Sequence, residues 1–541
     1  MKARVAAIAV LLPLAACQPS HPAPGPAGSE APAPHAAPVH APTATRAPPA
    51  DATPAAPTGI AWFRGSIEQA FATAQREQRP VLLFWGAQWC PFCHTLKATV
   101  FTRPDFIAKT RLFVPVYLDG DDAGAQRWGE RFGVIGYPTL VLLDPQRHEL
   151  LRLGAGRDVS AYAALLDLGL ERVRPVDTLL GKAAAHLPLS SDECRRLAFN
   201  SWELDTLEPR DYGERASRLL AAAQACPPHA SVERADLIIY AAGFAADAVP
   251  PVPALRGSLT DRVGSILSAP QLAAASAPAL QNLGAPFFAA VRARGAHFAA
   301  RLRSGYLAVM DAAAADPRYV TADQLGFVDA KIVALRALGG ARELTPGLLA
   351  AADRRIEQAL AAEQSPYVRP GLVNASLGIL EDSNQYRLAY RIARDEVSRA
   401  DAPYYYQADL AEIAEQLGHR HEAIALLKQS YQGARGPATR FQWGQRYLAG
   451  LLRMAPQDAA RIQRVGLQVL GELDGSDRIA DRTRVRLAQL DAQLRAWNRA
   501  ARGAHAAVLR ALRERMREQC ARLDAEGTAH AGCAAFLSTS T

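Results

Sequence analysis

The sequence predicts two folded parts, an α/β domain over residues 59–173 and a large all-α region over residues 174–541. In the first part, short apolar runs alternate with amphipathic stretches of helical period, a pattern typical of strands that alternate with helices. From about residue 176 onward no strand patterns follow, and Ala-, Leu- and Arg-rich stretches of helical period are separated by Pro and Gly. The predicted fold class is therefore α/β followed by all-α.

The elements of the α/β domain can be placed in order along the chain. Ser66 followed by Gln69 is a capping-box pattern, which predicts that a helix begins there. The continuous apolar run VLLFWG (81–86) predicts a buried strand, because both faces of such a strand are covered. The further predicted elements are a helix from Cys90 to Val100, a strand at 112–119, a helix within 121–133, a hairpin of strands at 139–144 and 149–154, and a helix from Asp158 to about Val173.

The N-terminus has the pattern of an export signal. Two basic residues precede an apolar stretch that is too short to span a bilayer. The end of this stretch, LAAC (14–17), resembles the lipobox of bacterial lipoproteins. That resemblance implies that residues 1–17 are a lipoprotein signal peptide with its lipobox, and that cleavage leaves Cys17 as the first mature residue, with lipid on its sulfur. It also implies that Gln18 favours the outer over the inner membrane. The alternative is an ordinary signal peptide that happens to contain a cysteine.

Residues 18–58 are expected to form a tether. They consist mostly of Pro, Ala, Ser, Thr and His and contain almost no large apolar side chains. Such a segment cannot bury enough surface to offset its ordering entropy. A Pro-rich chain extends by about 3.1 Å per residue, so a segment of this length could hold a domain up to roughly 120 Å from the lipid.

The charge of the chain does not indicate a nucleic-acid-binding protein. The formal net charge is +8 and the isoelectric point is about 9.2. However, the basic residues are scattered among acidic ones, as on solvated helix faces, and an exported protein rarely meets nucleic acid. The hydrophobic content of 49% is sufficient for extensive cores.

The cysteines predict disulfides. Of the seven cysteines, six remain when Cys17 is set aside, and an even number in an oxidising compartment favours pairing. Each of the two longer loops that neighbour pairing would close is worth roughly 3 kcal/mol of stability, although sequence alone does not prove connectivity. The neighbour pairs are Cys90–Cys93, Cys194–Cys226 and Cys520–Cys533.

The stretch WCPFCH (89–94) fits two kinds of redox site. C-x-x-C-H is the spacing that attaches a c-type haem, with His94 as axial ligand, and C-x-x-C after an apolar strand is the spacing of a redox-active dithiol. Haem is disfavoured because the motif directly follows a buried strand. A zinc site is disfavoured because no second C-x-x-C or H-x-x-H is present, so we expect neither metal nor cofactor. The methionines that could complete a haem site are distant in sequence: Met310, Met454 and Met516.

The order of these elements, the WCPFC motif and the GYPT stretch (136–139) before the hairpin together resemble the thioredoxin superfamily over about residues 60–173. The closest similarity is to thioredoxin-like domains of the thiol–disulfide interchange type, carried by WCPFCHTLKATVFTRPDFIA. The resemblance implies that Cys90 is the nucleophile and Cys93 the resolving thiol. It also implies that Trp89, Tyr137 and a cis Pro138 contact the substrate. The alternative for GYPT is an ordinary turn.

The chemistry of such a site follows from its place at a helix start. Unpaired backbone N–H groups and the helix dipole stabilise an anion there, which lowers the pKa of Cys90. Cys90 can then attack a substrate disulfide, and Cys93 resolves the mixed disulfide. In one respect the sequence departs from thioredoxins, because Phe84 occupies the place of their buried acid. Water, Asp119 or His94 would then accept the proton of Cys93, unless His94 is a solvent-facing helix residue.

The all-α region contains a pattern that resembles a tetratricopeptide-type helical hairpin. In the stretch 409–432, Leu410, Ile413 and Leu417 share one helical face and Gly418 makes the turn. Looser copies flank it at a spacing of about 34–37 residues. Stacked hairpins make concave surfaces that bind peptides or proteins, and a plain helical bundle is the alternative.

Two functions are consistent with this sequence. The first is an envelope thiol–disulfide oxidoreductase that acts on protein thiols or disulfides in the direction of reduction or isomerisation. In this function the helical region binds or orients a partner, a membrane electron donor is a candidate partner, and nucleic acid is not. The second is a non-enzymatic scaffold lipoprotein in which Cys90–Cys93 is a structural disulfide, because a fold does not imply its function.

Overall fold

The computed structural model describes the chain from Gly59 to Leu537, apart from residues 155–157, 171–173, 205–208, 364, 475–478, 480 and 526–535. Residues 1–58 and 538–541 lie outside the described part, and with them the predicted signal peptide, Cys17 and the tether. From Gly59 onward the chain forms one compact unit, in which the α/β domain and the helical region pack against each other.

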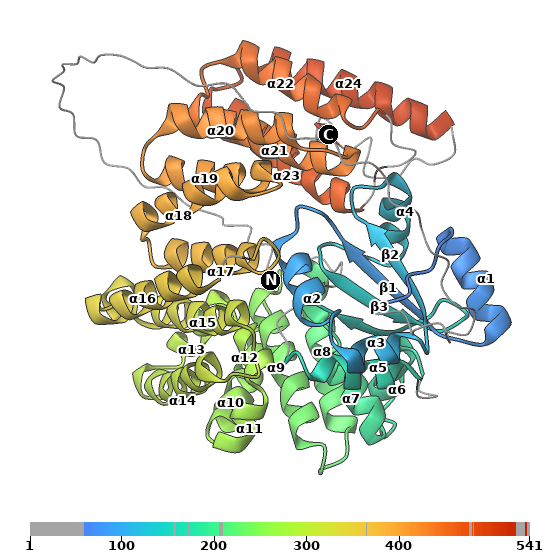
Figure 1. Ribbon diagram of the computed structural model, residues 1–541. Coiled ribbons are helices and arrows are strands. Elements are labelled where there is room, and N and C mark those ends of the chain that lie inside the picture. Colours follow the sequence, from blue (N-terminus) through green and yellow to red (C-terminus); the bar gives the residue numbers. More distant parts are fainter. Residues whose placement is uncertain are drawn as a thin grey trace, which may run out of the picture. The chain divides into compact units, whose positions relative to one another are not determined.

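A four-stranded sheet forms the centre of the α/β domain (Figure 1). Its strand order is β2-β1-β3-β4, with β1 parallel to β2 and antiparallel to β3, and with β3 antiparallel to β4. Every residue of β1 and β3 is buried, because helices cover both faces of the sheet. The strands are β1 (Val81–Gly86), β2 (Val114–Asp119), β3 (Thr139–Leu143) and β4 (Glu149–Leu153).

Five helices surround this sheet. Ser66 caps the first of them with both hydrogen bonds of a capping box, as its sequence predicts. Strand β2 begins at Val114 rather than at Leu112, because the amides of Leu112 and Phe113 close the turn after α3 and leave Leu112 exposed. The helices are α1 (Ile67–Glu77), α2 (Pro91–Thr99), α3 (Pro104–Thr110), α4 (Ala123–Arg131) and α5 (Ala161–Leu170).

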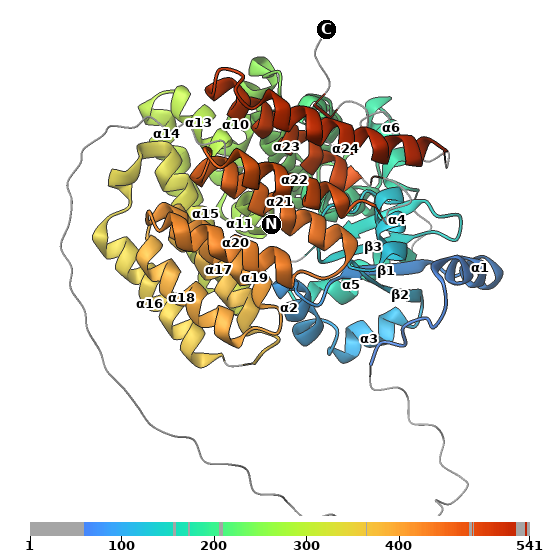
Figure 2. The same cartoon turned by 90° about the horizontal axis from the view of Figure 1, so that it is seen from above.

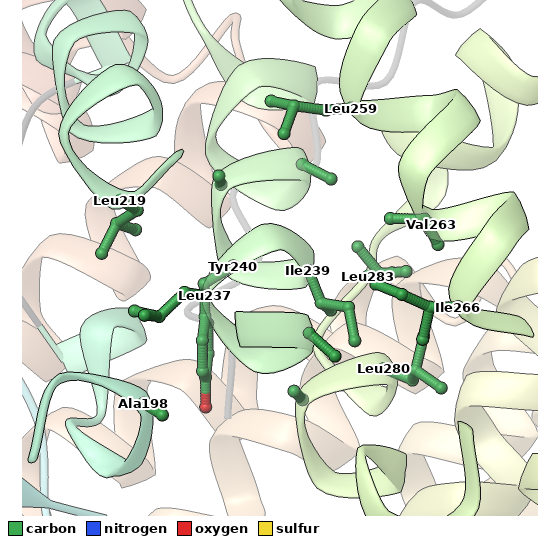
Figure 3. Close-up of a cluster of buried hydrophobic side chains, with 14 of the residues drawn as sticks. Ala198, Leu219, Leu237, Ile239, Tyr240, Leu259, Val263, Ile266, Leu280 and Leu283 are labelled. Carbon is green, nitrogen blue, oxygen red and sulfur yellow. The ribbon is translucent and has the colours of Figure 1, made fainter. Parts of the chain in front are cut away.

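The described part of the chain after α5 contains helices and no strand, which confirms the predicted fold class. Its first core surrounds α9, from which Leu237, Ile239 and Tyr240 project towards α7, α8 and α10 (Figure 3). These first helices are α6 (Val176–Ala184), α7 (Ser191–Phe199), α8 (Tyr212–Ala225), α9 (Ser231–Asp247), α10 (Pro253–Leu267), α11 (Pro270–Ala275), α12 (Ala277–Gln281), α13 (Ala285–Ala293), α14 (Ala296–Ala315), α15 (Thr321–Gly339) and α16 (Pro346–Ala362).

The helices from α17 to α22 pack one after another along the chain (Figure 1). Gly418 lies between α19 and α20 with φ +83°, a conformation that favours glycine and makes the predicted turn. Consecutive packing of this kind is what stacked hairpins require, while the assignment to a repeat family stays a prediction. These helices are α17 (Arg369–Asp382), α18 (Tyr386–Arg399), α19 (Pro403–Gln416), α20 (Arg420–Gly433), α21 (Pro437–Met454), α22 (Ala459–Gly471), α23 (Asp481–Ala500) and α24 (Ala506–Ala525).

The cysteines outside the WCPFCH motif lie in the helical region. Cys194 of α7 and Cys226 at the end of α8 form a disulfide with their Cα atoms 5.9 Å apart. Cys520 is buried in α24, whereas Cys533 lies outside the described residues, so the pair Cys520–Cys533 stays a prediction. Among the described helices, none combines the length and the apolar character that a bilayer crossing needs.

Candidate active site: a dithiol at the start of α2

Cys90 and Cys93 form a disulfide at the N-terminus of α2, with their Cα atoms 5.2 Å apart. Cys90 is the N-cap residue and has an extended backbone, and Pro91 takes the first helical position, where its missing N–H costs nothing. The backbone N–H of Cys93 donates to the Sγ atom of Cys90 over 3.1 Å. The same N–H also donates to the carbonyl oxygen of Cys90 over 3.1 Å. The first turn of α2 thus directs a backbone amide at the sulfur that the sequence predicts to be the nucleophile.

Two opposing effects act on the pKa of Cys90 when the disulfide is reduced. The side chain is only 3% exposed, and burial in an apolar site raises the pKa of a thiol. The amide of residue 93 and the helix dipole stabilise the thiolate and lower that pKa. Thiols at helix starts and in C-x-x-C motifs commonly have pKa values between about 3.5 and 7.5, compared with about 8.5 for a free cysteine. We therefore expect the thiolate to be favoured here.

Tyr137 packs against the buried cluster that contains Cys90 and Cys93, and a cis peptide bond joins it to Pro138. Thr139 pairs with Trp85 at the end of β1, which brings the GYPT stretch next to the loop that leads into α2. The Tyr137 ring packs edge-on against Trp89 with 5.9 Å between the ring centroids. Its hydroxyl donates to the carbonyl oxygen of Gly120 and accepts from Nε2 of Gln126. The structure thus brings together the residues that the sequence predicts at this site.

The helical region covers Trp89. The ring of Tyr405 in α19 stacks on the Trp89 ring at 5.8 Å, and Trp443 of α21 contacts it edge-on at 6.3 Å. The indole N–H of Trp89 donates to the carboxylate of Asp121, and the hydroxyl of Thr439 in α21 donates to the same carboxylate. The sequence does not predict these contacts. The only local signal was the aromatic run Tyr404–Tyr406 at the start of a helix.

Phe84, which occupies the position of the buried acid of thioredoxins, lies in an apolar environment. Phe84 is fully buried and packs against Trp62, Phe101 and Tyr117. Lys97, one turn after Cys93, places its ammonium 4.7 Å from the centre of the Tyr117 ring. Burial lowers the pKa of Lys97, and the negative charge of Asp119 opposes this shift. The chain therefore supplies a half-buried cation rather than an acid near this position.

His94 is half-buried and does not face solvent freely. Its ring packs edge-on against Tyr367 at 5.9 Å, and its Nδ1 atom has no hydrogen-bond partner among the described residues. Burial lowers the pKa of His94, and the charge of Lys97 lowers it further. A neutral imidazole can accept a proton, so His94 stays a predicted acceptor, and its lowered pKa makes it a weaker base than an exposed histidine. The methionines of the haem hypothesis lie in cores of the helical region: Met310, Met454 and Met516.

The sequence around this site is similar to that of known proteins. Residues 67–169 match the family model of a thioredoxin-like domain. Over 85 residues the chain is 31% identical to the thiol:disulfide interchange protein DsbD 2 of Pseudomonas aeruginosa, an overlap of 15% of this chain and 14% of that protein. The chain thus spans only a small part of that relative's length.

A solved structure titled DsbH oxidoreductase matches 22% of this chain and 93% of its own chain, at 19% identity and a TM-score of 0.19. Taken with the family match, the Cys90–Cys93 pair is consistent with thiol–disulfide oxidoreductase activity on protein thiols or disulfides.

Proposed function

We propose that the protein is a thiol–disulfide oxidoreductase in which Cys90 is the nucleophile and Cys93 the resolving thiol. The observation that carries the proposal is the amide of Cys93 directed at the sulfur of Cys90 at the start of α2. The packing of Tyr137 against Trp89 and against the buried cluster that contains the dithiol supports it, as does the family match of residues 67–169.

The reaction is a pair of sulfur exchanges. In the reduced protein the Cys90 thiolate attacks one sulfur of a substrate disulfide, forms a mixed disulfide and releases the first substrate thiolate. Cys93 then loses its proton and attacks the sulfur of Cys90, which forms the Cys90–Cys93 disulfide and releases the second substrate thiolate. Protons from the dithiol and from water convert both substrate thiolates to thiols. A protein dithiol donor returns the disulfide to the dithiol, and a membrane electron donor is our candidate for this class.

The residues beside the dithiol would bind the substrate. Trp89 directly precedes Cys90 and packs against Tyr137, which is followed by Pro138. The backbone of Tyr137 would pair with an extended substrate segment, as in strand addition. The similarity of part of the chain to an interchange protein supports reduction or isomerisation as the direction. The lipobox-like sequence at Cys17 supports a periplasm-facing lipoprotein, at the outer membrane by the residue that follows it. The helical region would bind or orient the partner, which its consecutively packed helices support.

A trapping experiment tests this function. Wild-type protein should accelerate the reduction of insulin by dithiothreitol, and Cys90→Ser should abolish the acceleration. Cys93→Ser should accumulate mixed disulfides on Cys90 in cells. A matched control is the double variant Cys194→Ser and Cys226→Ser, which removes a remote disulfide and should keep the activity.

The burial of the disulfide favours a second candidate. Cys90 is 3% exposed and Cys93 is fully buried, as expected for a structural bridge in a scaffold protein. Equal insulin reduction by wild type and Cys90→Ser, together with no trapped partner in Cys93→Ser, would support this scaffold.

A further inference from the structure

The helical region closes the face of the α/β domain on which the dithiol lies. Helix α17 packs against α2, and α21 packs against α4 (Figure 1, Figure 2). Pro138 is buried and Trp89 and Tyr137 are half-buried, although a substrate segment would have to reach them. The surface that the proposed reaction uses is thus occupied by the chain itself.

The central contact of this closure is aromatic. Tyr405 stacks on Trp89, and the Tyr405 and Trp443 rings meet at right angles with 5.9 Å between their centroids. We call Tyr405 and Trp443 the aromatic wall. Because the wall covers the ring of Trp89, the residue that precedes Cys90, it limits the directions from which a second sulfur can approach Cys90.

Polar side chains of the helical region contact the two residues of the aromatic wall. Asn374 donates its amide N–H to the hydroxyl of Tyr405 over 2.9 Å. The guanidinium of Arg446 lies 4.8 Å from the centre of the Trp443 ring and forms ion pairs with Asp409 and Glu412. These contacts hold the Tyr405 and Trp443 rings in place within the helical region, independently of their contact with Trp89.

One polar group of the aromatic wall is unsatisfied. The indole N–H of Trp443 is buried and has no hydrogen-bond partner among the described residues. A buried donor without an acceptor is unfavourable compared with one exposed to water. The packing around Trp443 is therefore less favourable than packing that satisfies this donor, and the hydrogen bond from Thr439 to Asp121 is the polar contact that opposes opening.

We propose that Tyr405 and Trp443 are specificity-determining residues of the dithiol site. While the wall is closed, a small dithiol can reach the sulfur of Cys90 far more readily than a folded protein can. A protein dithiol or disulfide reacts only in molecules whose wall has opened. This inference rests on the proposed function and adds that residues of the helical region select the partner.

The test compares two reductants of the Cys90–Cys93 disulfide. Reduction of purified full-length protein is followed by tryptophan fluorescence, with dithiothreitol as the small dithiol and a reduced thioredoxin as the protein dithiol. Tyr405→Leu should raise the ratio of the protein rate to the dithiothreitol rate about tenfold, the change expected in the opening equilibrium when this aromatic contact is lost. Tyr431→Leu is the matched control, because Tyr431 is a buried tyrosine of α20 that packs on Tyr447, and the ratio should not change.

The possible outcomes separate the two proposals. If wild type is reduced by both dithiols and Tyr405→Leu leaves the ratio unchanged, the wall has no role and the function stands. If neither dithiol reduces wild type and insulin is not reduced, the function itself is wrong. If Tyr405→Leu does not fold, Thr439→Val replaces it, because this variant removes only the hydroxyl that donates to Asp121 and should raise the ratio at least threefold. No change in that variant would also overturn the inference.

Discussion

The contact between α17 and α2 can be perturbed at a single glycine. A Cβ atom at Gly371 would lie 2.4 Å from Oγ1 of Thr95, which is too close for the two atoms to keep their positions. Gly378 lies on the same helix, and the nearest atom to a Cβ there is 3.7 Å away, an ordinary contact distance. Gly371→Ala and Gly378→Ala therefore differ in whether they disturb the packing against the dithiol helix.

The expected magnitudes follow from helix propensity and one hydrogen bond. Alanine is about 1 kcal/mol better than glycine inside a helix, so Gly378→Ala should gain about that amount. At Gly371 the Thr95 side chain must rotate, and its hydrogen bond to the carbonyl oxygen of Pro91 would be lost. That loss costs about 1 kcal/mol, so Gly371→Ala should be near neutral. In a Thr95→Ala background the clash is absent. There Gly371→Ala should raise the free energy of unfolding by about 1 kcal/mol, as Gly378→Ala does in wild type.

Urea unfolding measures the coupling between positions 371 and 95. It compares wild type, Gly371→Ala, Thr95→Ala and the double variant, with Gly378→Ala as the control. The midpoint should rise in Gly378→Ala, stay in Gly371→Ala and rise when Gly371→Ala is added to Thr95→Ala. The rate of disulfide reduction by a protein dithiol should also increase in Gly371→Ala, because the closure is strained. Equal stabilisation by Gly371→Ala and Gly378→Ala would refute the close packing of α17 on α2.

Two further predictions concern stability. The Cys194–Cys226 disulfide spans 32 residues in sequence, so replacing both cysteines with serine should lower the free energy of unfolding by about 3–4 kcal/mol, measured by urea denaturation; an unchanged midpoint would contradict this. Burial and nearby carboxylates raise the pKa of Glu381 from 4.5 to about 8. The folded protein therefore keeps a proton that the unfolded chain releases, and stability should fall as the pH rises from about 4.5 to about 8. The melting temperature of wild type should be lower at pH 8.5 than at pH 5.5, and this difference should be smaller in Glu381→Gln. An equal decline in wild type and Glu381→Gln would count against the raised pKa of Glu381.

The sequence was sufficient for the features that depend on local pattern. The continuous apolar run of β1, the capping box at Ser66 and the turn at Gly418 are each specified by a few neighbouring residues. The position of the dithiol at a helix start follows equally from the strand before it and from Pro91.

The closure of the site could not be predicted in this way. Thr439 and Asp121 share a hydrogen bond across 318 residues of sequence, and no local pattern indicates that α21 meets the loop after β2. From the sequence, the aromatic run Tyr404–Tyr406 is as consistent with core residues of the helical region as with contacts to the dithiol site. Only the packed structure places Tyr405 on Trp89. The start of β2 was misplaced because Leu112 is apolar yet exposed, which the apolar pattern does not distinguish from a strand residue.

The acidity of Cys90 tests the account most directly. In the reduced Cys93→Ser variant, Cys90 is the free thiol of the site and the backbone N–H of residue 93 remains in place. The rate of alkylation by iodoacetamide, followed by mass spectrometry across pH, gives the pKa of that thiol. The account predicts a pKa at or below about 7.5. A pKa of about 8.5 or higher, the value of an unperturbed cysteine, would contradict it.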